Sequence, residues 1–179
     1  VLALGAKASF VARTIDVEVE LTKEILVKGA CHKGISVTEA LVNCVIFNHR
    51  THADFAESKA LREERTILLR HGEKMLFGAE RNKGLVLDGL KLKVITVGED
   101  GYTIDDVLTH DAHEEDTTLH TMLASMRYPE FPVAIGVIRD VERPTYDSEV
   151  ARQIEEQKSA KPNLCANDLF RQGEVWKVE

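Results

Sequence analysis

Residues 35–46 read Ile-Ser-Val-Thr-Glu-Ala-Leu-Val-Asn-Cys-Val-Ile, an apolar run rich in valine and isoleucine. Such a run is typical of a buried strand. A shorter apolar stretch lies at 8–13, and between the two stretches a helical pattern runs from Asp16 to His32, where Gly34 ends it. Strand, helix and strand in about 40 residues predict a βαβ unit, with parallel strands and a right-handed crossover.

The helical pattern is amphipathic. Val17, Leu21 and Ile25 recur every four residues and mark one face. Asp16 stands where an N-cap is expected, and the glycine after the last turn suits a C-terminal stop.

A second signature predicts a hairpin near 84–97. Two apolar segments, 85–87 and 90–94, flank Asp88-Gly89. This dipeptide favours a type I′ turn because both central residues need a positive φ. Alternation along the second segment places its apolar residues (Leu90, Leu92, Val94) inward and its lysines (Lys91, Lys93) outward.

The remaining chain is assigned by pattern. We expect an α/β fold with strands parallel in the βαβ unit, and two regions, 1–142 and 143–179, the second being a polar helical tail that makes subunit contacts. Because the chain opens at Val1 inside an apolar helical turn, we interpret it as the C-terminal part of a longer polypeptide. The other expected elements are a loop at 48–57, a charged helix at 58–70, an acidic loop at 99–116, a helix at 117–126 and a strand at 132–138.

Composition excludes several classes. The 179 residues carry a formal net charge of −7, and 6% of them are aromatic. An acidic chain with few aromatic residues lacks the basic face and the stacking platforms of nucleic-acid-binding proteins. No run of 18 apolar residues is present, so we expect no transmembrane segment.

The cysteines point to a reducing compartment, the cytoplasm. Cys31, Cys44 and Cys165 are odd in number and widely spaced, unlike a disulfide framework. Cys44 stands out because it comes where the apolar run ends, and ligands gather at the carboxyl ends of strands in open α/β sheets. This thiol is either a small core residue or a metal ligand. We expect Cys31 to pack and Cys165 to remain a free thiol.

Several short segments, in this order and spacing, resemble the β subunit of the 2-oxoacid:ferredoxin oxidoreductases, closest to its 2-oxoglutarate-type members. They span the chain from residue 4 to residue 146. The segments are Leu4-Gly5-Ala6, Phe10-Val11-Ala12-Arg13, His32-Lys33-Gly34, Cys44-Val45-x-Phe47-Asn48, Tyr128-Pro129-Glu130-Phe131-Pro132, Gly136-Val137-x-Arg139 and Glu142-Arg143-Pro144-Thr145-Tyr146.

The resemblance implies the C-terminal part of a doubly wound fold that binds thiamine diphosphate, with the hairpin as an insertion. It implies an enzyme that pairs with an α subunit, oxidatively decarboxylates a 2-oxoacid to an acyl-coenzyme A, and passes electrons through a [4Fe–4S] cluster to ferredoxin. The family's motif for Mg²⁺ and the diphosphate, and its other cluster cysteines, lie upstream of the matching segment. We therefore expect the cofactor site on a preceding N-terminal part of the β subunit, and no catalytic residue here.

One ligand is carried over by the resemblance. The family's cysteine at the position of Cys44 supplies the fourth thiolate of the cluster, which suits the preference of Fe–S clusters for thiolates. Asn48, four residues later, is the candidate cofactor-binding residue. Pyruvate-type members have Ser-Pro before this cysteine, whereas Val42-Asn43 stand here.

Other interpretations remain open. Within the family, the substrate is alternatively pyruvate or a branched-chain 2-oxoacid. In a different class, the chain is a non-enzymatic α/β interaction domain in which Cys44 only packs. A third alternative is a small zinc-binding regulatory domain that uses His49, His52 and Cys44.

A second group of potential metal ligands lies at 110–116, reading His-Asp-Ala-His-Glu-Glu-Asp, with His120 nearby. Its spacing matches no standard metal motif. A solvated acidic loop is therefore the preferred interpretation.

Overall fold

The computed structural model describes residues 1–160, 165–171, 173 and 176. None of the helices in these ranges has the length and apolar character to cross a bilayer. The chain divides into two compact units, Val1–Arg143 and Pro144–Glu179. The helices are α1 (Leu2–Gly5), α2 (Val19–Cys31), α3 (Ala53–Ala56), α4 (Lys59–Arg65), α5 (Thr118–Ser125), α6 (Tyr146–Ala160) and α7 (Ala166–Phe170), with one 3-10 turn at Ile104–Asp106. The strands are β1 (Phe10–Ile15), β2 (Ser36–Leu41), β3 (Thr66–Leu69), β4 (Leu76–Phe77), β5 (Lys83–Asp88), β6 (Lys91–Thr96) and β7 (Val133–Asp140).

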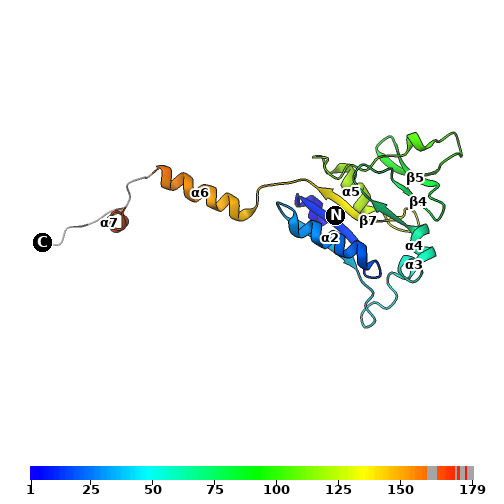
Figure 1. The fold of residues 1–179 in the computed structure, drawn as a ribbon, viewed down its shortest axis with the longest axis horizontal. Coiled ribbons are helices and arrows are strands. Elements are labelled where there is room, and N and C mark those ends of the chain that lie inside the picture. Colours follow the sequence, from blue (N-terminus) through cyan, green and yellow to red (C-terminus); the bar gives the residue numbers. More distant parts are fainter. Residues whose placement is uncertain (161–164, 172, 174–175, 177–179) are drawn as a thin grey trace. The chain divides into compact units, whose positions relative to one another are not determined.

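The first unit is built on a four-stranded sheet with the order β2-β1-β7-β3 (Figure 1). β1 and β2 are parallel and joined through α2, which confirms the predicted βαβ unit. β7 runs antiparallel to β1 but parallel to β3, so the sheet is mixed.

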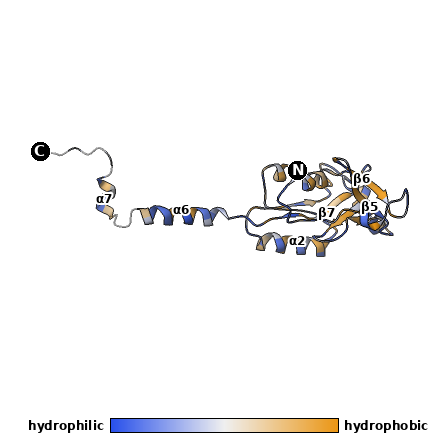
Figure 2. Ribbon diagram, turned by 90° about the horizontal axis from the view of Figure 1, so that it is seen from above, coloured by the Kyte–Doolittle hydropathy of each residue, from blue (hydrophilic) through white to orange (hydrophobic). Residues whose placement is uncertain are grey.

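Helices cover both faces of this sheet (Figure 2). On one face Ile25 of α2 packs on Phe10 and Ala12 of β1. On the other face α1 and α5 contribute Leu4 and Leu123 to the main core. The expected α/β class, with its hairpin and polar helical tail, is confirmed.

The predicted charged helix at 58–70 is wrong in its second half. α4 begins after Ser58, whose hydroxyl accepts the N–H of Leu61 at 3.2 Å, and ends at Arg65. Residues 66–69 are strand β3, parallel to β7, with Leu68 exposed between buried neighbours. The four residues carry no strand periodicity of their own in the sequence, so the helical pattern before them decides the prediction.

The βαβ unit also differs in detail from the prediction. α2 is preceded by Glu18 as N-cap residue and has no side-chain cap, so Asp16 does not cap it. β2 ends at Leu41, and the residues that follow are a loop. β2 is exposed or half-buried along its whole length because it lies at the edge of the sheet, whereas the apolar run predicts a buried strand.

The hairpin is confirmed as β5 and β6, which belong to a second sheet of order β4-β5-β6. Asp88 pairs with Lys91, so the turn consists of Gly89 and Leu90 rather than Asp88-Gly89. Gly89 has a φ of 61°. Leu90, expected to face inward, is 88% exposed because it occupies the turn itself.

The second unit carries the polar helix α6. None of its residues is buried, and ion pairs run along its surface, for example Arg152 with Glu149 and Lys158 with Glu155. A helix that is polar all round needs such pairs, or a partner, to be stable.

Candidate functional site

Cys44 lies in the loop that leaves β2 at its carboxyl end. β1 and β2 end side by side, since the N–H of Asp16 donates to the carbonyl of Leu41 at 3.1 Å. The thiol is therefore placed at the edge of the sheet where the sequence predicts it. It is half-buried rather than sealed in the core.

Backbone N–H groups surround the sulfur. The N–H of Phe47 donates to Sγ of Cys44 at 3.4 Å, and the N–H of Asn48 donates to the carbonyl of Cys44 at 3.0 Å. Hydrogen bonds from the backbone of Phe47, then of Ile46, lower the pKa of the Cys44 thiol, against the smaller opposing effect of burial. Donors aimed at sulfur stabilise a thiolate, which is the form that binds metal.

The rest of the loop is held by its own polar contacts. Nδ2 of Asn48 donates to the hydroxyl of Thr51 at 2.8 Å, which leaves the side-chain oxygen of Asn48 for another ligand. Arg50 and Glu57 form a two-point ion pair, with distances of 2.6 and 2.8 Å from Nε and an Nη to the carboxylate oxygens. The loop is thus pinned at its far end while its tip stays open.

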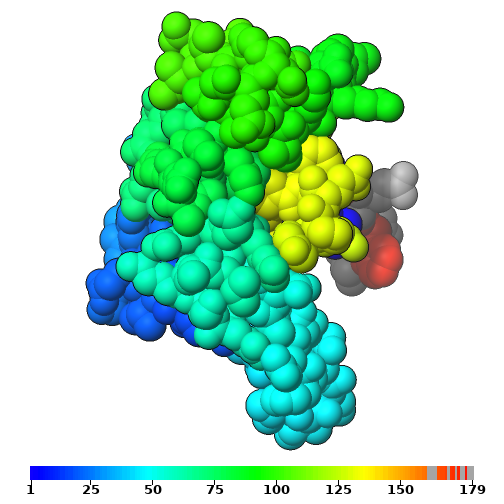
Figure 3. Space-filling view, turned by 90° about the vertical axis from the view of Figure 1, so that its right-hand side faces the viewer, coloured from blue at the N-terminus to red at the C-terminus, as the bar shows by residue number. Residues whose placement is uncertain are grey.

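The tip beside the thiol is apolar. Val45, Ile46 and Phe47 follow Cys44, and Phe47 is 92% exposed. Figure 3 shows this cyan segment projecting from the body of the molecule. Contiguous exposed apolar side chains are typical of a contact surface.

The zinc alternative has no support in the geometry. Within the described residues, no three of the His, Cys, Asp and Glu side chains come together as metal ligands. His52 instead packs its ring on Phe55 of α3, with centroids 5.4 Å apart, and His49 is exposed. Cys44 therefore offers a single thiolate, and a cluster needs its other ligands from another polypeptide segment.

The group at 110–120 is not a metal site either, and it is only partly a solvated loop. His110 and His120 are both buried. Nε2 of His110 donates to the carbonyl of Val137 at 2.9 Å, while Nδ1 is buried without a partner among the described residues. Burial lowers the pKa of His110 to about 4 and also lowers the pKa of His120.

The largest charged side chain in the core, Arg139, completes this cluster. Its guanidinium donates to the carbonyls of Glu114 and Glu115, and it lies 3.3 Å from Nδ1 of His120. A buried guanidinium that binds loop carbonyls holds the acidic loop onto β7. Arg139 belongs to one of the segments that resemble the family. Nothing in the sequence pattern, however, predicts its burial or that of the two histidines.

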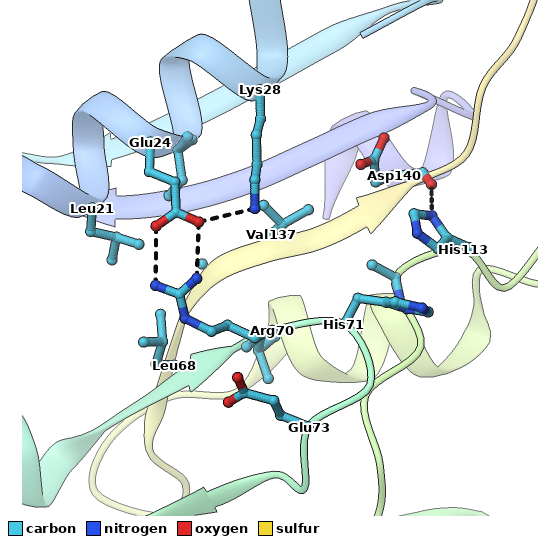
Figure 4. A pocket seen from close by; sticks show the side chains of 14 residues that line it. Leu21, Glu24, Lys28, Leu68, Arg70, His71, Glu73, His113, Val137 and Asp140 are labelled. Atoms are coloured by element: carbon cyan, nitrogen blue, oxygen red, sulfur yellow. Dashed lines mark hydrogen bonds and ion pairs between the residues drawn. The ribbon is translucent and has the colours of Figure 1, made fainter. Parts of the chain in front are cut away.

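A polar cavity of about 280 Å³ lies between α2, the end of β3 and β7 (Figure 4). Glu24 faces Arg70 in a two-point pair of 2.9 and 3.0 Å, and Lys28 donates to the same carboxylate at 3.0 Å. These contacts hold the pKa of Glu24 at about 2. His71 and His113 lie at the other end, with tilted rings whose centroids are 4.2 Å apart. The negative charge of Glu24 is already compensated by Arg70 and Lys28. We therefore assign this cluster a structural role, in which it joins α2 to the end of β3.

Ser9, His32 and Asp140 form a chain of hydrogen bonds. Ser9 Oγ lies 2.9 Å from Nε2 of His32, and Nδ1 of His32 lies 2.8 Å from Oδ1 of Asp140. The order resembles a nucleophilic triad, but Ser9 is only 2% exposed and its oxygen also accepts the N–H of Ile35 at 2.7 Å. The hydroxyl is out of reach of a substrate and ties β2 to β1 and β7.

The other two cysteines offer no site. Cys31 ends α2, and it is exposed rather than packed as predicted. Cys165 precedes α7 and is also exposed. Both are free thiols.

Comparison with known proteins identifies a relative. The 2-oxoglutarate oxidoreductase subunit KorB of Mycobacterium tuberculosis is 32% identical over 181 aligned residues, which cover 99% of this chain. The chain is a homologue of this subunit. The family resemblance read from the sequence is therefore confirmed. No family model and no solved structure matches.

The aligned region makes up 48% of KorB, so the chain spans about half the length of this relative. Activity, cofactors and partners are argued below as proposals.

Proposed function

We propose that the chain is part of the β subunit of a 2-oxoglutarate:ferredoxin oxidoreductase and that Cys44 supplies one thiolate of a [4Fe–4S] cluster. The observation that carries this proposal is the combination of homology along the whole chain with a thiol placed at the carboxyl edge of the parallel strands. The half-buried sulfur and its backbone N–H donors fit a cluster thiolate.

The cofactors of the complete enzyme would supply the chemistry that this chain lacks. Thiamine diphosphate with Mg²⁺ would support decarboxylation of the 2-oxoacid, the cluster would carry single electrons to ferredoxin, and coenzyme A would accept the acyl group. The residues of this chain would hold the cluster and shield it from water. Cys44 would bind iron, the side-chain oxygen of Asn48 would face the cofactor, and the apolar tip at 45–47 would keep water from the metal.

Iron content tests the thiolate role directly. The complete enzyme, with the α subunit and the rest of the β subunit, is purified without oxygen as wild type and as Cys44→Ser. We expect the wild type to be brown with broad visible absorbance, and Cys44→Ser to lose at least part of its iron and most of its electron transfer. Cys31→Ser and Cys165→Ser are the matched controls and should keep both.

The substrate is tested on the same preparation. We expect reduction of ferredoxin with 2-oxoglutarate and coenzyme A to exceed that with pyruvate or a branched-chain 2-oxoacid. A colourless wild-type preparation whose thiols are all free would contradict the proposal and favour the non-enzymatic interaction domain. A brown preparation that prefers pyruvate would retain the cluster and change only the substrate.

A further inference from the structure

β6 has a free side. It is the terminal strand of the second sheet and, within the described residues, pairs with β5 alone. Lys91 belongs to the pair that closes the hairpin turn, and just beyond β6 the N–H of Val97 donates to the carbonyl of Asn82 at 2.7 Å. Main-chain groups alternate in direction along a strand, so those of Leu92 and Val94 point away from β5. Neither residue has a main-chain partner on that side among the described residues.

Two cavities follow this free side. One of about 450 Å³ lies along residues 90–92, and a second of about 500 Å³ lies along residues 93–96. The segment at 122–132 lines both cavities, which share Glu130 and Phe131. The two cavities therefore form one groove beside the strand, which we call the β6 groove.

The β6 groove has an apolar lining suited to side chains from an extended peptide. Methionine adapts its shape to different apolar partners, and an extended peptide presents every second side chain to the same surface. The apolar residues that line the groove along β6 and along the segment at 122–132 include Leu90, Leu92, Val94, Met122, Met126 and Phe131.

The charged residues that β6 brings to the groove are lysines. Lys91 and Lys93 are both exposed, and neither forms an ion pair within the part of the chain that the structure describes. They are two positions apart, so their side chains leave the strand on the same side. Arg127 adds a positive charge on the opposite wall, next to Glu130. The strand itself therefore offers two cations in the register of a neighbouring strand.

We propose that the β6 groove binds an extended segment of a partner protein in which acidic and apolar residues alternate. The segment would pair with the outward main-chain groups of Leu92 and Val94 and direct its apolar side chains to the groove lining. Its carboxylates would lie across from Lys91 and Lys93, because opposite charges directly across from each other stabilise a pair of strands. This binding site goes beyond the proposed function, since it uses neither Cys44 nor the sheet that carries it.

The same lysines select against a second copy of the chain as the occupant. Pairing of two β6 strands would bring Lys91 and Lys93 of one copy against those of the other. Like charges across a strand pair are destabilising, and edge lysines are a common protection against self-association. The groove therefore favours an acidic strand over a copy of itself.

The test is the binding of two synthetic peptides to the full chain, followed by fluorescence anisotropy. One fluorescein-labelled peptide has the repeat Glu-Val, and the other has lysine in place of each glutamate. The chain is prepared as wild type and as the double variant Lys91→Glu/Lys93→Glu. Lys23→Glu/Lys59→Glu carries the same change of charge on exposed lysines of α2 and α4, and it is the matched control. Circular dichroism checks that each variant is folded.

We expect the wild type and the control to bind the glutamate peptide, more weakly as salt is added. Lys91→Glu/Lys93→Glu should bind it about tenfold less tightly and should prefer the lysine peptide instead. Cys44→Ser should bind as the wild type does, so failure of this inference and failure of the cluster proposal are distinguishable.

Hydrogen exchange locates the contact. The bound glutamate peptide should slow the exchange of the amides of Leu92 and Val94, which a charge attraction without strand pairing would not do. No saturable binding by the wild type, equal weakening in the control, or slowed exchange only outside residues 90–96 and 122–132 would overturn the inference. A homodimer that buries β6 and excludes the peptide would also overturn it, and would assign the groove to a second copy.

Discussion

The carboxylate of Glu24 on α2 receives two hydrogen bonds from the guanidinium of Arg70, at 2.9 and 3.0 Å. The two residues stand on different layers, since Arg70 directly follows β3 and α2 covers the sheet. Two-point pairs of this kind fix geometry as well as charge. The pair therefore holds the crossover helix in place above the sheet that positions Cys44.

Glu24→Gln should lower the free energy of unfolding at pH 7 by about 1 kcal/mol, after allowing for solvent screening of a partly exposed pair. In the folded state the pKa of Glu24 lies at about 2, below its ordinary value of 4.5. The stabilisation is thus fully present above pH 4.5 and disappears as the pH falls toward 2. Urea unfolding across this range measures it. Glu20→Gln, in a more exposed pair with Lys23, is the control and should change little.

His110 gives a pH dependence of the same sign at a higher pH. Burial lowers its pKa from 6.5 to about 4. Between these two pH values, the unfolded chain binds a proton at this residue and the folded chain does not. Stability should therefore fall as the pH drops from 6.5 to 4, by up to about 3 kcal/mol from this residue. His110→Gln should flatten the slope, leaving the smaller contribution of His120. His49→Gln, on the exposed loop, should leave the slope unchanged, and an unchanged slope in His110→Gln would refute the assignment.

Ser9 should prove structural rather than nucleophilic. Ser9→Ala leaves the N–H of Ile35 and Nε2 of His32 without their hydrogen-bond partner. We therefore expect a loss of about 1–3 kcal/mol in the free energy of unfolding. A fluorophosphonate reagent should not label the folded wild type, because the hydroxyl is buried. Labelling at Ser9, or an unchanged stability of Ser9→Ala, would show that the hydroxyl is accessible after all.

The sequence predicts those parts of the fold that depend on short-range pattern. The βαβ unit follows from two apolar runs around an amphipathic helix, and the hairpin follows from a turn glycine between two apolar segments. β3 is not predicted because its four residues carry little periodicity of their own. The exposure of β2 is not predicted because an apolar run indicates that a strand can be buried, but not where the strand lies in its sheet.

The site divides in the same way. The position of Cys44 at the carboxyl edge follows from the end of an apolar run, so the sequence predicts it. The contact of His32 with Asp140 spans 108 positions, and the burial of His110 depends on the loop folding back onto β7. Such long-range contacts leave no local signal in a single sequence.

The thiolate character of Cys44 can be tested in the chain without metal. Backbone hydrogen bonds lower the pKa of this thiol, with that from Phe47 the strongest. Alkylation of Cys44, followed by mass spectrometry over a series of pH values, should therefore reach half its maximal rate below the pH typical of a free cysteine. Phe47→Pro removes the N–H donor and should raise that midpoint, whereas Phe47→Ala removes the same exposed ring, keeps the N–H and should not. If both variants shift the midpoint equally, the ring and not the backbone controls the thiol, and the loop loses its fit to a cluster ligand.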